Sequence, residues 1–490
     1  MPVRGLRGGK LRVLTDEGLK RIHIATLEIL SEVGVKMEYL PALEIFEGFG
    51  ADVNFDKKIV KIDEQLLKKG LSTAPSRFTL YGKNEDFDVK VDTERVYTIA
   101  GSSALSVLDL EGNHRPALYE DLVKFTLLQD QLENLHIMHG IVIPSDFEEY
   151  GVDRIIFAGV FPYTRRNYYS QSQTGADGVQ EQIKLAAVFQ GSEDAVRKNP
   201  MFSEVCCMVS PLKHEKINSE VLIESAKNNI PVYIEVDALA GGTTPAPLAG
   251  TLVEGNANIL AGIVLAQLVN PGTPCVYRTA SSIMDMTTGG FAGAAPESNL
   301  IHCATAQLAH YYNLPYSGGT GIDAKIPDEQ AGYERALQLL SNAMAGDNLI
   351  ALATGMMEMM LTASYEQCVI DNEIMGAVYR MLEEVVVDDE TLSLDLLRKV
   401  AVKEQGHFLY FKETAEYIKR NNWVPKLTNR NVWNSWKAEG GKSMREAAND
   451  LAGKILKENN EPVISRDQTD EIMDMAKSFH KRAIEKSKNI

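Results

Sequence analysis

The chain of 490 residues is poor in aromatic residues and lacks an excess of positive charge. Aromatic side chains make up 7% of the residues, and 50 Lys and Arg face 67 Asp and Glu, which gives a formal net charge of -17. An electrostatic field of that sign repels phosphate backbones and anionic membrane surfaces. We therefore expect neither nucleic acid nor a membrane among the partners.

Several familiar sequence motifs are also missing. No segment approaches about 20 uninterrupted apolar residues, and the amino-terminal residues have no apolar stretch of the signal-peptide type. Five cysteines without CxxC or Cys/His spacing predict buried thiols in a reducing, cytoplasmic compartment. Neither a GxGxxG fingerprint nor a P-loop occurs. His136 and His139 are three apart on a predicted strand and so point to opposite faces, and we expect no metal site.

What the sequence does contain is a repeated alternation of apolar strands and amphipathic helices. Four strand-then-helix units follow one another between residues 231 and 362, and four more are traced upstream from Tyr97, His136, Asn167 and Met201. This alternation is typical of an α/β fold with a parallel sheet. Eight such units predict a (β/α)8 TIM barrel, whose site lies at the carboxyl ends of the strands.

The barrel is predicted to span residues 97–385, between two flanking regions. Residues 1–96 are expected to form an N-terminal α/β cap, with a helix that begins after the N-cap Thr15 and a layer of strands and hairpins from residue 51 onward. Residues 386–490 are expected to form a C-terminal helical extension. Its lysine-rich tail is typical of a solvated helix.

The fifth predicted strand, residues 232–237, has the clearest side-chain phase. Its apolar residues alternate with Tyr233, Glu235 and Asp237, so these three side chains should point into the barrel. Arg278 on the neighbouring sixth strand should face the same interior. Glu235 and Arg278 then either form a buried structural ion pair or contact substrate, and both interpretations stay open. Asp237, nearer the mouth, is the better candidate for substrate contact.

Further candidates for substrate binding are expected around the barrel rim. The aromatic cluster at residues 161–163 precedes the third strand, belongs to the opposite end and is rejected. The turn at residues 317–321 either binds an anion or simply reverses the chain. A mouth of mixed polar, acidic and apolar groups suits a small cation. The rim candidates are Gln171 and Gln173 after strand three, Phe291 after strand six, Asp323 and Lys325 after strand seven, and Met356 on strand eight.

Long segments of the chain resemble a known family. They include SPLKHEKINSEVLIESAKNNIPVYIEVDALAGGTTPAPLAGTL from residue 210 and AQLAHYYNLPYSGGTGIDAKIPDEQAGYE from residue 306. Both are similar to the trimethylamine:corrinoid methyltransferase family, and the similarity runs from LTDEGLKRIHIATLEILSEVGVKM to EQGHFL. The founding members carry pyrrolysine in the barrel. Because this chain has only standard residues, it resembles the non-pyrrolysine branch.

The resemblance implies a methyltransferase with a quaternary amine as substrate, such as glycine betaine, proline betaine, carnitine or γ-butyrobetaine. The acceptor would be the Co(I) corrinoid (cobalamin) of a separate partner protein, with none tightly bound to this chain. We also expect a homo-oligomer, and the catalytic residues stay unknown. Two alternatives remain: an aldolase or lyase that uses Lys325 as a Schiff-base lysine, which requires a buried lysine, and a non-catalytic betaine-binding protein.

Overall fold

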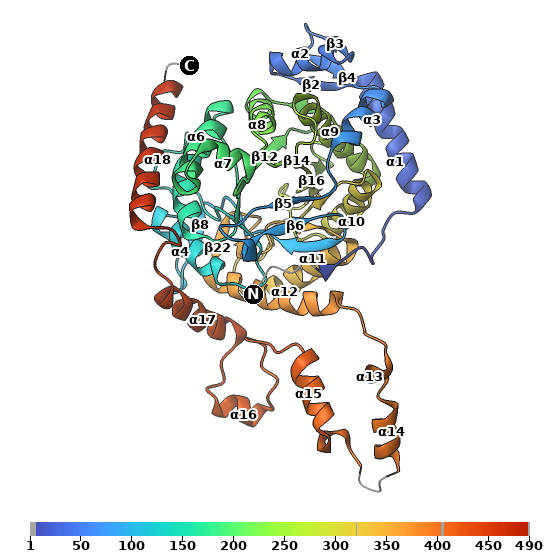
Figure 1. The fold of residues 1–490 in the computed structure, drawn as a ribbon, viewed down its shortest axis with the longest axis vertical. Coiled ribbons are helices and arrows are strands. Elements are labelled where there is room, and N and C mark those ends of the chain that lie inside the picture. The colour runs from blue at the N-terminus through green and yellow to red at the C-terminus, as the bar shows by residue number, and fades with distance from the viewer. Residues whose placement is uncertain (1–5, 320, 403–405, 489–490) are drawn as a thin grey trace.

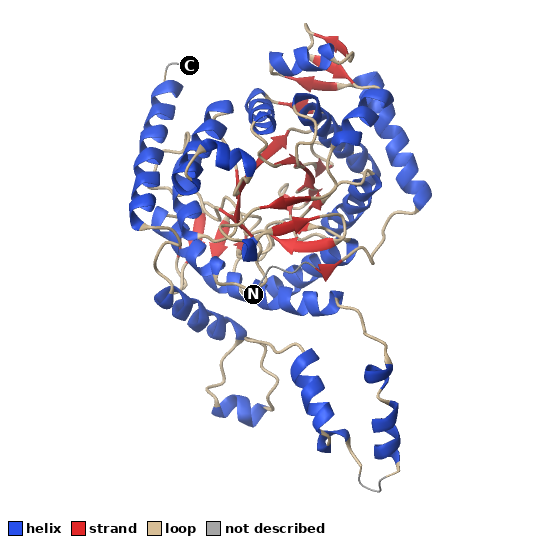
Figure 2. Ribbon diagram, viewed as in Figure 1, coloured by secondary structure: helices blue, strands red, loops and turns tan. Residues whose placement is uncertain are grey.

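The computed structural model describes residues 6–319, 321–402 and 406–488. Figures 1 and 2 show a mixed α/β fold in which a curled parallel sheet is surrounded by helices. All five neighbouring pairs in this sheet are parallel, as the strand-helix alternation predicted. Its strands, in spatial order, are β10 (Ile137–His139), β11 (Asn167–Ser170), β12 (Phe202–Met208), β14 (Val232–Val236), β16 (Cys275–Thr279) and β19 (Tyr316–Ser317).

Two further strands lie between the ends of the curled sheet. Strand β7 (Arg95–Thr98) pairs in parallel with β20 (Leu349–Ile350) and in antiparallel with β1 (Leu6–Arg7). Beside β10, the Ala100 amide donates to the Ile137 carbonyl at 3.0 Å. Beside β19, the Asn348 amide donates to the Tyr316 carbonyl at 3.1 Å. Backbone hydrogen bonds therefore join this pair to both edges of the six-stranded sheet.

Each of these eight strands is followed by a helix on the outside of the sheet. Helix α9 is long and apolar enough to cross a membrane, but 83% of its most apolar window is buried inside the protein, where it packs on β14 and β16. It is therefore a core helix of the fold. The eight helices are α4 (Tyr119–Asp130), α5 (Asp153–Val160), α6 (Ala176–Gln190), α8 (Lys216–Lys227), α9 (Leu248–Val269), α10 (Pro296–Tyr311), α11 (Glu329–Ala345) and α12 (Tyr365–Leu382), with the short α7 (Glu193–Lys198) after α6.

The N-terminal region packs on α9. Helix α1 (Asp16–Glu28) begins as predicted, because the Thr15 hydroxyl accepts a hydrogen bond from the Gly18 amide at 3.0 Å. The expectation of strands and hairpins is wrong for residues 64–73, which form helix α3 (Glu64–Thr73). The buried face of this helix, which includes Gly70, packs on α9, and this contact favours the helix over a strand. The small sheet consists of β2 (Val35–Met37), β3 (Asp52–Asn54), β4 (Ile59–Lys61) and β13 (Lys213–His214), beside α2 (Leu40–Gly48).

A hairpin of β5 (Phe78–Leu80) and β6 (Val89–Val91) covers the amino-terminal ends of the parallel strands, an end of the fold that we call the floor; Figure 1 shows it crossing these strands. The Asn167 side-chain amide at the start of β11 donates to the Tyr81 carbonyl at 3.0 Å. The Tyr97 hydroxyl donates to the Lys90 carbonyl at 3.2 Å. These bonds fasten the hairpin to the strand ends and close the floor.

The opposite end, which we call the mouth, is bordered by short strands. The expectation that Met356 lies on the eighth strand is wrong. Strand β20 ends at Ile350, Leu352 has a φ of 54° that turns the chain, and Met356 lies buried in the following strand β21. The mouth strands are β8 (Ser106–Leu108), β9 (His114–Pro116), β21 (Met356–Met357) and β22 (Thr362–Ser364) in one sheet, and β15 (Leu239–Ala240), β17 (Ser282–Met284) and β18 (Phe291–Ala292) in another.

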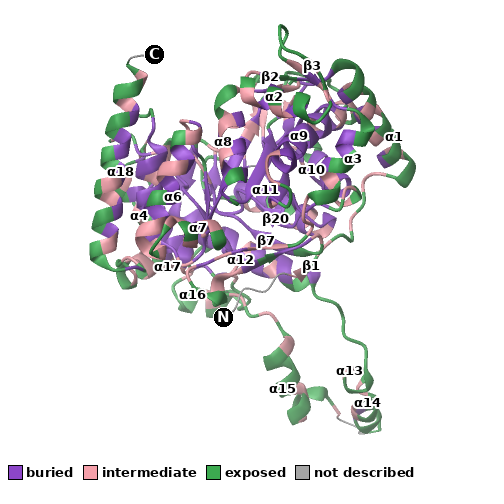
Figure 3. Ribbon diagram, turned by 45° about the horizontal axis from the view of Figure 1, so that its top comes forward, coloured by how far each residue is buried: buried purple, intermediate pink, exposed green. Residues whose placement is uncertain are grey.

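The C-terminal region is helical, as predicted, but its tail is not only a solvated helix. Helix α18 packs on α5 and α6 and buries Ile472, Ala476 and Ala483, because its apolar residues recur on one face. Between α12 and α17 the chain forms an arm, residues 383–402 and 406–443, which is mostly exposed (Figure 3) but returns to the body at residues 426–428, whose amides donate to the Glu373 carboxylate on α12. The helices are α13 (Asp389–Leu392), α14 (Leu394–Ala401), α15 (Lys412–Asn421) and α16 (Trp433–Ala438) in the arm, then α17 (Met444–Glu458) and α18 (Arg466–Ser487).

Candidate functional site

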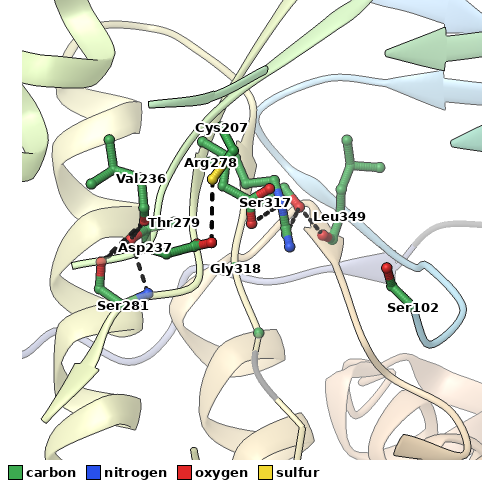
Figure 4. Close-up of polar contacts among 12 residues, drawn as sticks. Ser102, Cys207, Val236, Asp237, Arg278, Thr279, Ser281, Ser317, Gly318 and Leu349 are labelled. Atoms are coloured by element: carbon green, nitrogen blue, oxygen red, sulfur yellow. Dashed lines mark hydrogen bonds and ion pairs between the residues drawn. The ribbon is translucent and has the colours of Figure 1, made fainter. Parts of the chain in front are cut away.

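Asp237 is an exposed carboxylate at the mouth, directly after a strand whose five residues are all buried. Its backbone neighbours are bonded to the next strand on both sides. The Thr279 hydroxyl donates to the Val236 carbonyl at 2.9 Å, and the Ala238 amide donates to the Ser281 hydroxyl oxygen at 2.9 Å (Figure 4). The end of β16 therefore holds Asp237 in place while its side chain remains accessible.

Glu235 and Arg278 form the buried ion pair that one of the two sequence interpretations predicted. The residues are directly opposite each other on β14 and β16, and Arg278 Nε lies 2.8 Å from Glu235 Oε1. Their side chains are only 10% and 3% exposed. Burial raises the pKa of Glu235 to about 7, the guanidinium of Arg278 opposes this rise, and the nearby carboxylate of Asp237 adds to it. We therefore assign this pair a structural role below the mouth.

Arg278 connects four strands of the interior. Its Nη1 atom donates to the Ser317 hydroxyl oxygen at 3.0 Å, and that hydroxyl donates to the Leu349 carbonyl at 2.7 Å (Figure 4). The chain of bonds runs from β14 through β16 and β19 to β20. A charge held this way has little freedom to move toward a substrate.

Cys207 on β12 contacts the carboxylate of Asp237. Its Sγ atom donates to Asp237 Oδ2 at 3.3 Å, and the potential ligand atoms of Cys207, Glu235 and Asp237 lie within 4.8 Å of one another. Burial and the neighbouring carboxylates of Asp237 and Glu235 raise the pKa of the Cys207 thiol, so it stays protonated. A metal ion needs the thiolate, and Arg278 already neutralises Glu235. This donor set fits a divalent cation poorly.

Aromatic rings fill the interior of the curled sheet beneath this cluster. The rings of Tyr169 and Tyr233 are 4.5 Å apart, and His139 lies 4.7 Å from Tyr169 on the other side. Burial and the charge of Arg278 lower the pKa of His139 to about 3, so its imidazole is neutral. His139 does face the interior, away from the side of His136, as predicted. Tyr169 was overlooked by the sequence analysis, although it has the same parity as Asn167 on β11 and Gln171 just after this strand.

Two of the rim candidates hold loops together. Asp323 accepts hydrogen bonds from the Gly293 amide at 3.0 Å and the Ala294 amide at 3.1 Å, which fastens β18 to the segment after β19. Gln173 is half-buried, and its backbone amide donates to Asp153 Oδ2 at 3.3 Å. The structure does not bring these two residues into contact with Asp237.

The other rim candidates lie at different levels of the mouth. Gln171 is exposed just after β11, and Phe291 is half-buried on β18. Lys325 is exposed, with its Nζ atom 2.8 Å from the carbonyl of Asp323. Met356 belongs to the core between the mouth strands and Gly101, where an added Cβ would meet its side chain.

Two backbone amides of the turn that begins at Ser317 already have acceptors within the protein. The Gly318 amide donates to Asp347 Oδ2 at 3.0 Å, and the Gly319 amide donates to His302 Nδ1 at 3.1 Å. Thr320 lies outside the described residues. The two amides stabilise the turn and are not available to bind an anion.

The Schiff-base alternative requires a buried lysine at the mouth, and Lys325 is exposed there. Burial lowers the pKa of a different lysine, Lys83, to about 7. Its Nζ atom donates to the Phe161 carbonyl at 2.6 Å and lies 3.7 Å from the centre of the Phe161 ring. Phe161 precedes β11, so this lysine belongs to the floor, the end that the sequence analysis rejected as a site.

Comparison with known proteins identifies the family of the chain. The family model described as trimethylamine methyltransferase (MTTB) matches residues 3–483. Trimethylamine methyltransferase MttB of Methanosarcina thermophila is 34% identical over 469 residues, 94% of this chain and 96% of that protein. Glycine betaine methyltransferase of Desulfitobacterium hafniense (strain Y51) is 31% identical over 432 residues, 88% and 89% of the two chains.

A solved structure also aligns with most of the chain. The monomethylamine methyltransferase (MtmB) of Methanosarcina barkeri covers 90% of this chain and 98% of its own, with a TM-score of 0.48 and 14% identity. The family assignment rests on the sequence matches. Because the family model spans nearly every residue and relatives above 30% identity cover most of both proteins, the chain belongs to the trimethylamine methyltransferase (MTTB) family.

Proposed function

We propose that this protein transfers a methyl group from a quaternary amine of the betaine type to the Co(I) corrinoid of a partner corrinoid protein. The observation that carries the proposal is the exposed carboxylate of Asp237 at the mouth. Glu235 is neutralised by Arg278, whereas no cationic side chain among residues 6–319, 321–402 and 406–488 forms an ion pair with Asp237. An accessible carboxylate without a partner cation suits a cationic ligand.

The chemistry of a quaternary ammonium group suits the residues around Asp237. Such a group has no N–H to donate, so it is recognised by carboxylates and by aromatic faces. Asp237 supplies the carboxylate, and Phe291 on β18 is the half-buried aromatic residue of the neighbouring hairpin. The thiol of Cys207 donates to Asp237 and orients its carboxylate.

The mouth is also suited to a corrinoid presented from outside. Strands β11 and β14 are followed by the exposed residues Gln171 and Asp237, so these strand ends are accessible from outside. The corrinoid would supply the cobalt nucleophile. This chain would hold the ammonium, align one N-methyl group with the opening, and exclude water from below through the closed floor. A neutral tertiary amine leaves, so the reaction needs no general acid.

The preferred substrate should be zwitterionic, with glycine betaine first. The glycine betaine methyltransferase relative supports this preference. A subsite for the carboxylate end of the substrate needs a cation or backbone N–H groups. The candidates from the sequence are Arg278, Lys325 and the turn at residues 317–321. Arg278 is paired with Glu235, and the Gly318 and Gly319 amides of the turn are occupied, so Lys325 is the candidate that we retain.

We also infer that the eight parallel strands close into a complete (β/α)8 barrel. The backbone hydrogen bonds from Ala100 to Ile137 and from Asn348 to Tyr316 support closure at both edges of the six-stranded sheet. Within the chain we retain the three regions 1–96, 97–385 and 386–490. A cytoplasmic location agrees with the free thiols of all five cysteines.

The decisive experiment measures the loss of the Co(I) cobalamin spectrum with glycine betaine, choline, tetramethylammonium and trimethylamine under identical conditions. We expect glycine betaine to react fastest and trimethylamine slowest. Equal rates for glycine betaine and tetramethylammonium would remove the carboxylate subsite, and a faster rate with trimethylamine would overturn the quaternary-amine assignment. Binding of glycine betaine without methyl transfer would support a binding protein, and borohydride trapping of a carbonyl substrate would support an aldolase.

A further inference from the structure

Helix α11 has two charged residues on its buried face and two large apolar residues exposed on its outward face. Glu334 is 4% exposed and Arg335 is completely buried, where it pairs with Asp371 at 3.1 Å. A barrel helix that faces water normally shows the reverse pattern. The outward face of α11 carries no charge over its central turns: Tyr333, Ala336 and Leu337 are exposed, Tyr333 at 58% and Leu337 at 52%, and the half-buried Leu340 and Met344 beside them pack against the core of the protein.

Other outer helices of the same barrel follow the normal rule. Helix α4 exposes Glu120, which pairs with the half-exposed Lys124, and α8 exposes Lys216 and Lys227. The uncharged face of α11 is therefore a local feature and not a property of the whole barrel surface. Contiguous exposed apolar faces of this kind mark interaction sites.

The helices of the arm, α13 to α16, form a second exposed apolar surface. Fifteen of the 35 large hydrophobic residues that are exposed in the described chain lie in the arm, which is shown in green in Figure 3. Helices α13, α15 and α16 bury no residue, and α14 buries only Val400. Isolated helices of 4 to 10 residues are marginal in water, so these need an external surface to pack on.

The arm presents a groove of suitable size and chemistry. Helices α13 to α15 enclose a groove of about 860 Å³. Charged residues border it, and Arg420 pairs with Glu390 at 2.7 Å across it. Its apolar lining is Leu392, Leu394, Leu396, Leu397, Phe408, Tyr417 and Ile418. An apolar groove of this type accepts one face of a helix through residues spaced i, i+4 and i+7, which is the spacing of Tyr333, Leu337 and Leu340.

We propose that the arm groove of one chain receives the outward face of α11 from a second copy of the chain, and that the exchange is reciprocal. In a two-fold dimer the same two surfaces meet twice, so the α11 face and the arm groove of both copies are covered. The uncharged face of α11 matches the apolar lining of the groove, while the charged border remains in water.

The position of the arm favours a second copy over the corrinoid protein. The arm leaves from the carboxyl end of α12, and the Tyr379 hydroxyl near that end donates to the Val96 carbonyl at the floor end of β7. A corrinoid protein must approach the mouth, at the opposite end of the strands. Exposed Val, Leu, Phe and Trp residues are also typical of a permanent interface rather than of a transient encounter. This inference does not depend on the methyl-transfer proposal.

The first test is the molar mass of the full-length protein, measured by sedimentation and by light scattering over a wide range of concentrations. We expect a dimer or a larger even-numbered oligomer. Leu337→Glu on α11 and Leu397→Glu on α14 should each halve that mass, because each places a charge in the apolar contact. The matched control is Ile24→Glu on α1, which is 62% exposed and lies outside both surfaces, and it should leave the mass unchanged.

The second test identifies which chain fills the groove. Two single variants, Tyr333→Cys and Leu394→Cys, are mixed and oxidised, and we expect a disulfide between the two different chains. Circular dichroism checks that each variant is folded. A monomeric wild type, or an oligomer that survives both glutamate substitutions, would overturn the proposal. Cross-linking of a double variant only within one chain would show that the arm folds onto its own α11 and would overturn it equally.

Discussion

The carboxylates of Asp130 at the floor and Asp237 at the mouth differ in how many hydrogen bonds they accept. At the floor, the buried Asp130 accepts hydrogen bonds from the Thr164 hydroxyl, from the Arg165 amide and from the Arg165 guanidinium, at 2.6 to 2.9 Å. At the mouth, the carboxylate of Asp237 accepts one bond from a thiol and is otherwise open to solvent. A carboxylate with every lone pair occupied stabilises the fold, whereas one left open is available to a ligand.

The largest expected effect is on the floor. Asp130→Ala should lower the free energy of unfolding by about 3 to 5 kcal/mol, because it leaves the guanidinium of Arg166, 5% exposed, without its nearest carboxylate. Urea denaturation measures the change, with Asp194→Ala, whose side chain is 96% exposed, as the control. Methyl transfer per folded molecule should remain. A loss of activity without a loss of stability would break the distinction between floor and mouth.

A pH-dependent effect should follow from Glu204, which faces the helices from the outer side of β12. It is fully buried, accepts bonds from the Ser172 amide at 3.0 Å and hydroxyl at 2.8 Å, and burial raises its pKa from 4.5 to about 8. The stability contributed by the protonated form is complete below the unfolded pKa and is lost as the pH rises through the folded pKa.

Glu204→Gln keeps the neutral form at every pH. Relative to wild type it should therefore gain about 2 kcal/mol or more of unfolding free energy between about pH 5 and about pH 9. Thermal or urea unfolding at several pH values measures the difference. A constant difference across this window would show that Glu204 is ionised in the folded protein.

At the mouth, we expect a substitution of Asp237 to change activity and not stability. Asp237→Asn should reduce kcat/KM by about 10- to 100-fold, since a charge-assisted contact to the ammonium is worth about 1.5 to 3 kcal/mol, and it should leave the unfolding midpoint unchanged. Glu235→Gln, two residues earlier, should chiefly destabilise because it weakens the buried pair with Arg278. If both variants unfold to the same extent, the division between structural and ligand carboxylates fails.

The smallest expected effect is at the rim. Lys325→Gln should change the unfolding free energy by less than about 0.5 kcal/mol, because the side chain is exposed. It should reduce the preference for glycine betaine over tetramethylammonium by about tenfold or less, the size of a screened ionic contact. The ratio of the two Co(I) methylation rates measures this. An unchanged ratio would move the carboxylate subsite away from Lys325.

Part of the site could be predicted because strand periodicity is local. The alternation in residues 232–237 placed Glu235 and Asp237 on the interior side, and the order of the strands placed Arg278 beside them. The same reasoning failed for Met356, because nothing in its own segment signals that β20 ends at Ile350. It also overlooked Tyr169, whose inward direction follows from parity only once the bounds of β11 are known.

By itself the sequence determined the alternation of strands and helices, the cap at Thr15, the inward phase of the fifth strand and the family. Those properties depend on neighbouring residues or on overall similarity. Only the tertiary structure decided that Cys207 meets Asp237, that Thr279 and Ser281 hold its backbone, and that α11 turns its apolar face outward. Such contacts join residues far apart in the chain, and they depend on sheet register and helix packing that no local pattern specifies.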